Sequence, residues 1–400
     1  MVSVPGQVLV LNAGSSSLKY QVVDPTSGAA PVQGIVERIG SGAARLTHRD
    51  PGGTSDRDLD ADDHRAALAA VHDALHGSGI GEPDLRAVGH RVVHGGPRLT
   101  RAHLVDDAVL AEIEHLARLA PLHNPPAVEG IRSARAAYPS LPQVAAFDTA
   151  FFADLPPAAA TYAVDRALLE REEVRRYGAH GISHEYVAGE AAALLGRAPE
   201  VLSLVVLHLG NGASAAAVRG GRPVDTSMGL TPLEGLVMGT RAGDLDPGIL
   251  LHLMRHAGLG LDELEDLLHH RSGLEGMAGR HDFRDLLAAV DAGDGAARTA
   301  YDVYCHRLRK YVGAYLAVLG GADAVVFTAG VGEHVARVRA DALAGLSALG
   351  IEVDPVRNSS DDVGARLVSP DSSPVAVLVV PTNEELSIAR QAVAVLAGRL

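Results

Sequence analysis

The first residues of the chain alternate two apolar runs with a short polar turn. Val8–Leu11 is apolar, residues 12–17 are small and polar, and Leu18–Val23 is apolar around Lys19. Such runs, bounded by small polar residues, predict two strands joined by a tight turn. Gly14 lets the backbone approach a ligand, and bare N–H groups, hydroxyls and an ammonium group suit phosphate oxygens. A polar hairpin with a surface lysine explains the same pattern.

Two later segments repeat this plan. The apolar run 201–207 ends in the glycine-rich turn 208–214 and continues as 215–218, and the run 324–328 ends in a second glycine-rich turn, 329–334, before a predicted helix. Open α/β sheets bind ligands at strand ends. We therefore expect the three glycine turns to face one ligand, and their spacing predicts two related halves with a cleft between them. Any one of the turns could also be a plain connection.

The spacing of apolar residues predicts the helices and loops of the rest of the chain. Apolar residues near i, i+3 and i+4 predict helices over 63–75, 106–120, 261–270, 298–319 and 384–400. The polar segments 40–60 and 354–362 are predicted to be loops, or weak strands in the first case. A proline-containing break at 151–157 indicates a domain boundary near residues 150–155.

Composition limits the class of protein. A chain of 400 residues with 47% hydrophobic and 21% charged residues is typical of a globular protein with two or three domains. The net charge of −14 argues against nucleic acid and anionic membranes as partners. The single cysteine, Cys305, excludes an internal disulfide and favours a reducing compartment. Because no apolar run approaches a membrane span and the N-terminal residues do not resemble a signal peptide, we expect a cytoplasmic protein.

Charged residues lie among glycines at several predicted strand ends. Arg91 and Asp148 each follow an apolar run, and Arg241 lies in the long segment 225–248. An isolated pair of this kind is commonly a structural ion pair, but recurrence at successive strand ends predicts a site. His180 and His184, at i and i+4, raise the possibility of zinc, yet no HExxH motif or cysteine pair accompanies them.

Seven motifs occur in order along the whole chain: NAGSSSLK, HRVVHGG, LAPLHNP, FDTAF, HLGNGAS, DTSMGLTPLEGLVMGTR with GDLDPG, and TNEEL. Together they resemble the acetate kinase family, part of the wider group that holds sugar kinases, actin and heat-shock ATPases. The resemblance implies an α/β fold of two duplicated actin-like (ribonuclease H-like) domains with mixed sheets and an active site in the interdomain cleft. It implies an acyl and phosphate domain, 1–150 with the C-terminal helix 385–400, and a nucleotide-binding and dimerisation domain, 151–384.

The implied activity is that of a phosphotransferase with a carboxyl group as acceptor. The reaction is the reversible, in-line transfer of the γ-phosphoryl group of ATP to acetate, giving acetyl phosphate and ADP, with Mg²⁺ (or Mn²⁺ in its place) in a homodimer. Alternatives are a kinase for propionate or another short-chain acid, and a non-catalytic actin-like ATPase module. An arginine clamp for a small acid, Arg91 with Arg241, has no use in a protein that only hydrolyses ATP.

The resemblance also assigns site residues. The catalytic residues are Asp148, His180 and Arg241. The acid substrate contacts Arg91, Val93, Leu122 and Pro232, and Mg²⁺ contacts Asn12 and Glu384. The nucleotide contacts Lys19, His208, Leu209, Gly210, Asn211, Gly212, Asp282, Phe283, Arg284, Ala329, Gly330, Val331, Gly332 and Glu333.

Both reacting groups, the acid and the phosphoryl group, are anions, which explains why the resemblance assigns cationic residues to the site. Arginine holds carboxylates and phosphates at two points, and fixed cations offset the repulsion between the reacting groups. A carboxylic acid titrates near 4.3, so acetate is already ionised at neutral pH and needs no base. We therefore expect Asp148 to orient Mg²⁺ and its waters, with a role on a proton as the alternative.

Four positions depart from the family pattern. Ala179 stands where Phe precedes the catalytic histidine, Ile182 replaces Thr, Phe152 replaces His, and Ala329 replaces the first Gly of GGIGE. The loss of Phe at position 179 predicts a larger acyl pocket and better use of propionate. The alternative is that Phe152 or Ile182 fills the space.

Overall fold

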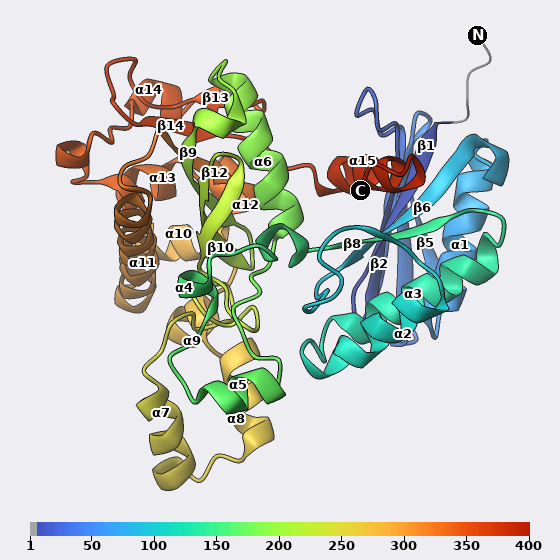
Figure 1. Ribbon diagram of the computed structural model, residues 1–400, viewed down its shortest axis with the longest axis horizontal. Helices are drawn as coiled ribbons and strands as arrows, with labels where there is room; N and C mark the ends of the chain where they lie inside the picture. The colour runs from blue at the N-terminus through green and yellow to red at the C-terminus, as the bar shows by residue number, and fades with distance from the viewer. Residues whose placement is uncertain (1–5) are drawn as a thin grey trace. The chain divides into compact units, whose positions relative to one another are not determined.

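The computed structural model describes residues 6–400, which divide into two compact α/β units. Unit 1 comprises Met1–Ala153 and Asn383–Leu400, and unit 2 comprises Asp154–Thr382. Figure 1 shows each unit as a sheet with helices on its faces. The units differ from the predicted domain ranges by only a few residues at each boundary.

Unit 1 is built on an eight-stranded sheet in the order β5-β4-β3-β2-β1-β6-β8-β7. Its strands are β1 (Gln7–Ala13), β2 (Ser17–Val23), β3 (Val32–Glu37), β4 (Ala44–Asp50), β5 (Gly53–Leu59), β6 (Leu85–Val92), β7 (His103–Leu104) and β8 (Gln143–Phe147). Strands β1–β5 pair antiparallel in succession, whereas β1, β6 and β8 are parallel. The predicted strand–turn–strand opening is confirmed, but Lys19 lies inside β2, opposite Asn12 of β1, and not in the turn.

The segment predicted as a loop or weak strands, 40–60, forms the full hairpin β4–β5. Strand β5 is exposed along nearly its whole length. Its polar residues pair with β4 through the backbone and bury neither face, so no alternation of apolar and polar positions marks the strand in the sequence.

Helices cover the two faces of the unit 1 sheet (Figure 1). Helices α1 (His64–Gly77) and α3 (Asn124–Ala137) pack on one face, and α15 (Glu384–Leu396) packs on the other, against β1, β6 and β8. The predicted helix 106–120 is shorter: α2 (Asp107–His115) continues only as a 3₁₀ turn, Leu116–Arg118. The C-terminal helix therefore completes the unit that begins the chain.

Unit 2 repeats the central arrangement of unit 1. Its six strands, in the order β11-β10-β9-β12-β14-β13, are β9 (Ser203–Leu209), β10 (Ala213–Arg219), β11 (Arg222–Thr226), β12 (Ala324–Thr328), β13 (Arg366–Leu367) and β14 (Ala376–Val379). Strand β9 pairs antiparallel with β10 and parallel with β12, as β1 pairs with β2 and β6. His208 and Leu209, predicted in a turn, belong to β9, so the turn itself is only 210–212.

The two faces of the unit 2 sheet have different partners. The long helix α11 (Gly295–Leu319) packs against β9 and β10 on the side of the main apolar core, and α6 (Gly181–Leu194) packs against β9 and β12. The other helices are α4 (Pro157–Ala160), α5 (Arg166–Arg171), α7 (Pro247–His252), α8 (Leu261–His270), α9 (Gly273–Ala278), α10 (Phe283–Asp291), α12 (Ala329–His334), α13 (Ala336–Leu343) and α14 (Pro355–Asn358). None of the helices within residues 6–400 combines the length and apolarity required to cross a bilayer.

Candidate active site

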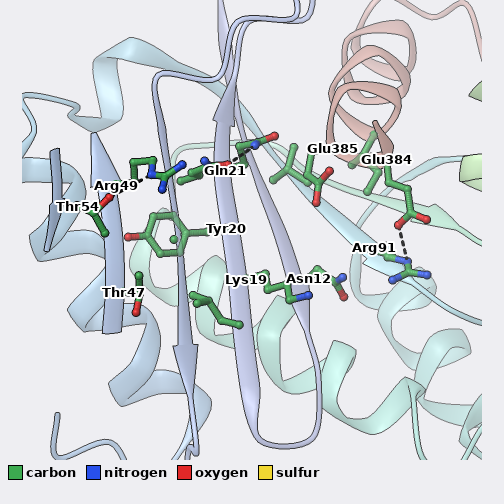
Figure 2. Close-up of a pocket in the computed structure, with 15 residues that line it drawn as sticks. Asn12, Lys19, Tyr20, Gln21, Thr47, Arg49, Thr54, Arg91, Glu384 and Glu385 are labelled. Carbon is green, nitrogen blue, oxygen red and sulfur yellow. Dashed lines mark hydrogen bonds and ion pairs between the residues drawn. The ribbon is translucent and has the colours of Figure 1, made fainter. Parts of the chain in front are cut away.

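In unit 1, an arginine and two carboxylates meet at the carboxyl ends of neighbouring strands. Arg91 is the penultimate residue of β6, and Asp148 directly follows the parallel strand β8. Arg91 Nη2 lies 2.8 Å from Asp148 Oδ2 and its Nε lies 3.2 Å from Oδ1, a two-point pairing. Glu384, at the start of α15, places Oε2 3.5 Å from Arg91 Nε (Figure 2).

The group of Arg91, Asp148 and Glu384 contains one basic and two acidic side chains. Burial raises the pKa of the Asp148 carboxyl to about 6; the attraction of Arg91 lowers it, and the repulsion of Glu384 raises it. Burial opposes the charge on Arg91, but attraction to Asp148 and Glu384 outweighs it and raises the pKa of the guanidinium. Two carboxylates against one cation leave the group net negative when all three are ionised.

A cavity of about 320 Å³ adjoins this group on the face of the sheet that carries α15. Asn12, Lys19, Arg91 and Glu384 line it, together with side chains of β2–β5 (Figure 2). Mg²⁺ in enzymes takes one or two carboxylates, keeps several waters and shares the phosphates of its substrate. The amide and carboxylate oxygens of Asn12, Asp148 and Glu384 fit such an ion, while no cluster of three or more His, Cys, Asp or Glu within residues 6–400 could cage a metal.

In unit 2, His180 occupies a strained position at the start of a helix. It is the N-cap of α6 with φ +58°, a left-handed conformation that side chains rarely adopt and that clusters at functional sites. Its Nδ1 lies 2.9 Å from Ser214 Oγ on β10. Its ring stacks on His208 of β9, with centroids 4.3 Å apart and 20° between the planes.

Arg241 and His180 both lie beside the β9–β10 turn. A methyl group placed on Gly212 would lie 3.4 Å from His180 Nε2 and 3.8 Å from Arg241 Nη1. Arg241 Nη1 also donates to the carbonyl oxygen of Pro232 at 3.2 Å. Among the described residues of unit 2, no carboxylate forms an ion pair with Arg241, and burial lowers the pKa of its guanidinium. Within the described part of unit 2, the Arg241 guanidinium therefore has no paired carboxylate.

Two of the three predicted nucleotide segments of unit 2 lie at adjacent strand ends. His208 pairs with Thr328, which places residues 208–212 beside residues 329–333. Residues 329–334, predicted as a turn, form the short helix α12. Ala329 has φ +62°, so a methyl group stands where the family's glycine would be unstrained. Arg339, almost fully buried, donates to the carbonyl oxygens of Gly332 and Glu333 at 2.9 Å and holds this turn in place.

The predicted residues 282–284 are engaged in the local structure of α10. Asp282 caps the helix by accepting from the Arg284 backbone N–H at 2.8 Å, and it pairs with the Arg284 side chain at 2.7 Å. Phe283 is 8% exposed and packs edge-on against Tyr304 in the core. Its ring faces the interior of unit 2, so only backbone and neighbouring atoms of this segment are open to a ligand.

The residues predicted to contact the acid belong to different units. Val93 and Leu122 belong to unit 1 and Pro232 to unit 2. Ala179, which precedes His180, is buried in the main core cluster of unit 2. The other two departures from the family pattern, Phe152 and Ile182, are also buried.

The structure adds polar residues to which sequence reasoning gave no role. Ser214 and His184 contact each other at 2.7 Å, and Ser183 lies 2.8 Å from His208 Nδ1 and 2.7 Å from Thr382 Oγ1. The i, i+4 spacing of His180 and His184 was a usable signal, because it places both rings on one face of α6. Their shared partner, Ser214, comes from a strand and has no sequence signal of its own.

The two similarly ordered units define a protein with the duplicated actin-like fold. Acetate kinase from Porphyromonas gingivalis superposes with a TM-score of 0.93 at 38% identity, covering 98% of this chain and 100% of that one. A propionate kinase from Francisella tularensis subsp. tularensis SCHU S4 gives 0.92 at 37%, covering 96% and 98%.

The sequence comparisons are more specific. Residues 7–390 match the acetokinase family. Acetate kinase of Leifsonia xyli subsp. xyli (strain CTCB07) is 58% identical over 394 residues, which is 98% of this chain and 99% of that protein. The chain belongs to the acetokinase family, and the predicted family and fold class are confirmed.

Proposed function

We propose that this protein is a phosphotransferase that moves the γ-phosphoryl group of ATP reversibly to acetate, giving acetyl phosphate and ADP. The observation that carries the proposal is that His180 Nε2 and Arg241 Nη1 lie 3.4 and 3.8 Å from the position that a methyl group on Gly212 would take, with no carboxylate among the described residues of unit 2 paired to the arginine. An unopposed cation beside a possible N–H donor suits a transferring phosphoryl group, whose charge spreads over its equatorial oxygens. The near full-length likeness to acetate kinases supports the choice of reaction.

We assign the acid and the metal to the unit 1 group. Arg91 contacts Asp148 and Glu384 through Nε and Nη2, and we expect its Nη1 to bind one oxygen of the acid. The surplus carboxylate charge suits a divalent cation. Asn12, Asp148 and Glu384 would hold Mg²⁺, or Mn²⁺ in its place, which neutralises phosphate charge when bound. Acetate needs no base, so orientation rather than proton transfer is the role proposed for Asp148.

We place the nucleotide against the strand ends of unit 2. Backbone N–H groups of residues 208–212 would contact its phosphates, and residues 282–284 and 329–333 would enclose the adenosine. Lys19, which lines the unit 1 cavity, would contact phosphate as a compact point charge. We further propose that the protein is cytoplasmic, because its single cysteine is buried and unpaired, as in proteins of a reducing compartment. From the resemblance to the family we also propose a homodimer.

The test is a panel of short-chain acids with ATP and Mg²⁺, in which hydroxylamine traps any acyl phosphate. We expect acetohydroxamate to form in proportion to enzyme and to require Mg²⁺ and acetate. Release of inorganic phosphate at the same rate with and without acetate, and no hydroxamate, would support the ATPase alternative instead.

Propionate is the second candidate substrate because of Ala179. An added methylene in an apolar pocket changes discrimination by roughly 1 to 3 kcal/mol. We expect a higher ratio of kcat/KM for propionate over acetate than in relatives with Phe at this position. Ala179 is packed in the core, so Ala179→Val is the milder probe and Ala179→Phe the stronger one. A ratio that neither variant changes would mean that position 179 does not shape the acyl pocket.

A further inference from the structure

A buried serine joins His180 to a second histidine. Ser214 is the second residue of β10, has no exposed surface and pairs across the strands with His208. Its Oγ lies 2.9 Å from His180 Nδ1 and 2.7 Å from His184 Nε2. The hydroxyl therefore bridges a ring at the helix start and a ring one turn further along α6.

The number of protons restricts how this bridge can be made. A serine hydroxyl has one proton to donate, and a neutral imidazole has one N–H. Three arrangements of neutral rings satisfy both contacts: His184 donates to Ser214 and Ser214 donates to His180 Nδ1; Ser214 donates to His184 and His180 Nδ1 donates to Ser214; or both rings donate to the two lone pairs of the serine oxygen. In the first arrangement His180 carries its proton on Nε2. In the other two, a neutral His180 has a bare lone pair on Nε2.

The neighbours of His180 described within unit 2 are one guanidinium and two further imidazoles. Its ring lies 4.3 Å from that of His208, and its Nε2 and Arg241 Nη1 lie 3.4 and 3.8 Å from the position that a methyl group on Gly212 would take. His184, which shares Ser214 with His180, is fully buried, and burial followed by the repulsion of His208 holds its pKa well below the ordinary value. A second positive charge on His180 would face Arg241 and a stacked imidazole, and its proton would add to an already cationic group.

We propose that Ser214 and His184 are positioning residues that fix His180 as a neutral imidazole with its proton on Nε2. The relay runs from His184 Nε2–H to Ser214 Oγ and from the Ser214 hydroxyl to His180 Nδ1. His180 then presents an N–H near Arg241, where a bare lone pair would repel phosphoryl oxygens. This inference rests on the proposed function, because it explains how His180 supplies a second hydrogen-bond donor, beside Arg241, to the transferring phosphoryl group.

The first test reads the tautomer and needs no substrate. In two-dimensional ¹H–¹⁵N spectra of histidine-labelled full-length protein, ring ¹⁵N shifts distinguish Nε2–H, Nδ1–H and imidazolium forms. His180 is assigned by its absence in His180→Gln. We expect the Nε2–H form at pH 7 in the wild type, and a mixture of tautomers in Ser214→Ala. A wild-type ring protonated on Nδ1, or an imidazolium, would overturn the proposal, whether or not the enzyme makes acetyl phosphate.

The second test is kinetic and uses matched serines. Ser214→Ala should lower kcat on the order of 100-fold, with the KM values for ATP and acetate nearly unchanged. His184→Gln, which keeps an N–H donor toward Ser214, should retain most of the turnover that His184→Leu loses. Ser369→Ala is the control, because Ser369 is also buried in unit 2 but its hydroxyl accepts only the Val377 backbone N–H at 3.0 Å.

The kinetic outcomes separate positioning from simple packing. Wild-type kcat in a folded Ser214→Ala protein would contradict the proposal, and so would equal losses in His184→Gln and His184→Leu. If Ser214→Ala does not fold, the wild-type spectrum and the two His184 variants still decide the question.

Discussion

The two arginines of the candidate site differ in what surrounds them. Arg91 in unit 1 is held at two points by Asp148 and lies 3.5 Å from Glu384, whereas within the described part of unit 2 the side chain of Arg241 donates to a backbone carbonyl and a methionine sulfur and pairs with no carboxylate. The first group carries more negative than positive charge, and the second is cationic. This difference in charge supports the proposal that a cation and a small acid bind in unit 1 and that an anion binds in unit 2.

The largest expected effect is the loss of turnover when Arg241 is removed. We expect Arg241→Ala to lower kcat by about 10² to 10³, the usual cost of losing a donor to a developing anion. Arg222→Ala is the matched control, because Arg222 is an exposed residue of β11 in the same unit. Near-normal turnover in a folded Arg241→Ala protein would remove Arg241 from the site.

Stability should separate the two arginines. Removal of Arg91 leaves the buried Asp148 carboxylate without its partner, which costs about 3 kcal/mol of unfolding free energy at pH 8. Removal of Arg241 breaks no ion pair within its unit, so the change should stay within about 0.5 kcal/mol. Urea titrations of both variants measure this contrast, and equal losses would contradict it.

The pH dependence of stability should follow Asp148. Its pKa is raised from 3.8 to about 6 on folding, so the folded protein binds this proton more tightly than the unfolded chain. The stabilising contribution is complete below about pH 4 and is lost as the pH rises through about 6. The unfolding free energy of the wild type relative to Asp148→Asn should therefore decrease between pH 4.5 and pH 7. A difference that is constant across this range would contradict the raised pKa.

The same variant tests the role of Asp148 in catalysis. We expect Asp148→Asn to require more Mg²⁺ for half-maximal turnover, because an amide is a weaker magnesium ligand than a carboxylate. If instead an activity limb near pH 6 disappears in Asp148→Asn while the Mg²⁺ requirement stays the same, Asp148 acts on a proton.

Lys19 tests whether unit 1 also contacts phosphate. Lys19→Arg should raise the KM for ATP several-fold, because a planar guanidinium replaces a compact charge in a small cavity. The chain's other lysine supplies the control, since Lys310 is exposed on α11 and Lys310→Arg should be silent. Wild-type KM in Lys19→Arg would argue against phosphate contact.

The smallest effect concerns the strained turn after β12. Ala329 has φ +62°, and glycine adopts this conformation without steric cost. Ala329→Gly should raise the unfolding free energy by about 0.5 to 1 kcal/mol. A loss of stability on thermal or urea unfolding would mean that the methyl group packs usefully there.

The sequence predicted which candidate residues lie at strand ends better than it predicted the hydrogen bonds between them. Arg91 and Asp148 were placed correctly because apolar runs end beside them, and α8 has its predicted bounds. Of the two predictions for 40–60, the loop is wrong and the strands are present as the hairpin β4–β5; the pattern does not distinguish them, because a polar edge strand shows no alternation. The link from His180 through Ser214 to His184 depends on a strand facing a helix, and no local pattern encodes that contact.

The most direct test of the contrast between the two groups is calorimetric titration with orthovanadate, an anion shaped like a phosphoryl group. Wild type, Arg241→Ala and Arg91→Ala are compared without nucleotide, at a temperature where all three are folded. We predict that vanadate binding is lost in Arg241→Ala and retained in Arg91→Ala. Binding that survives in Arg241→Ala and disappears in Arg91→Ala would contradict the assignment of the anion to unit 2.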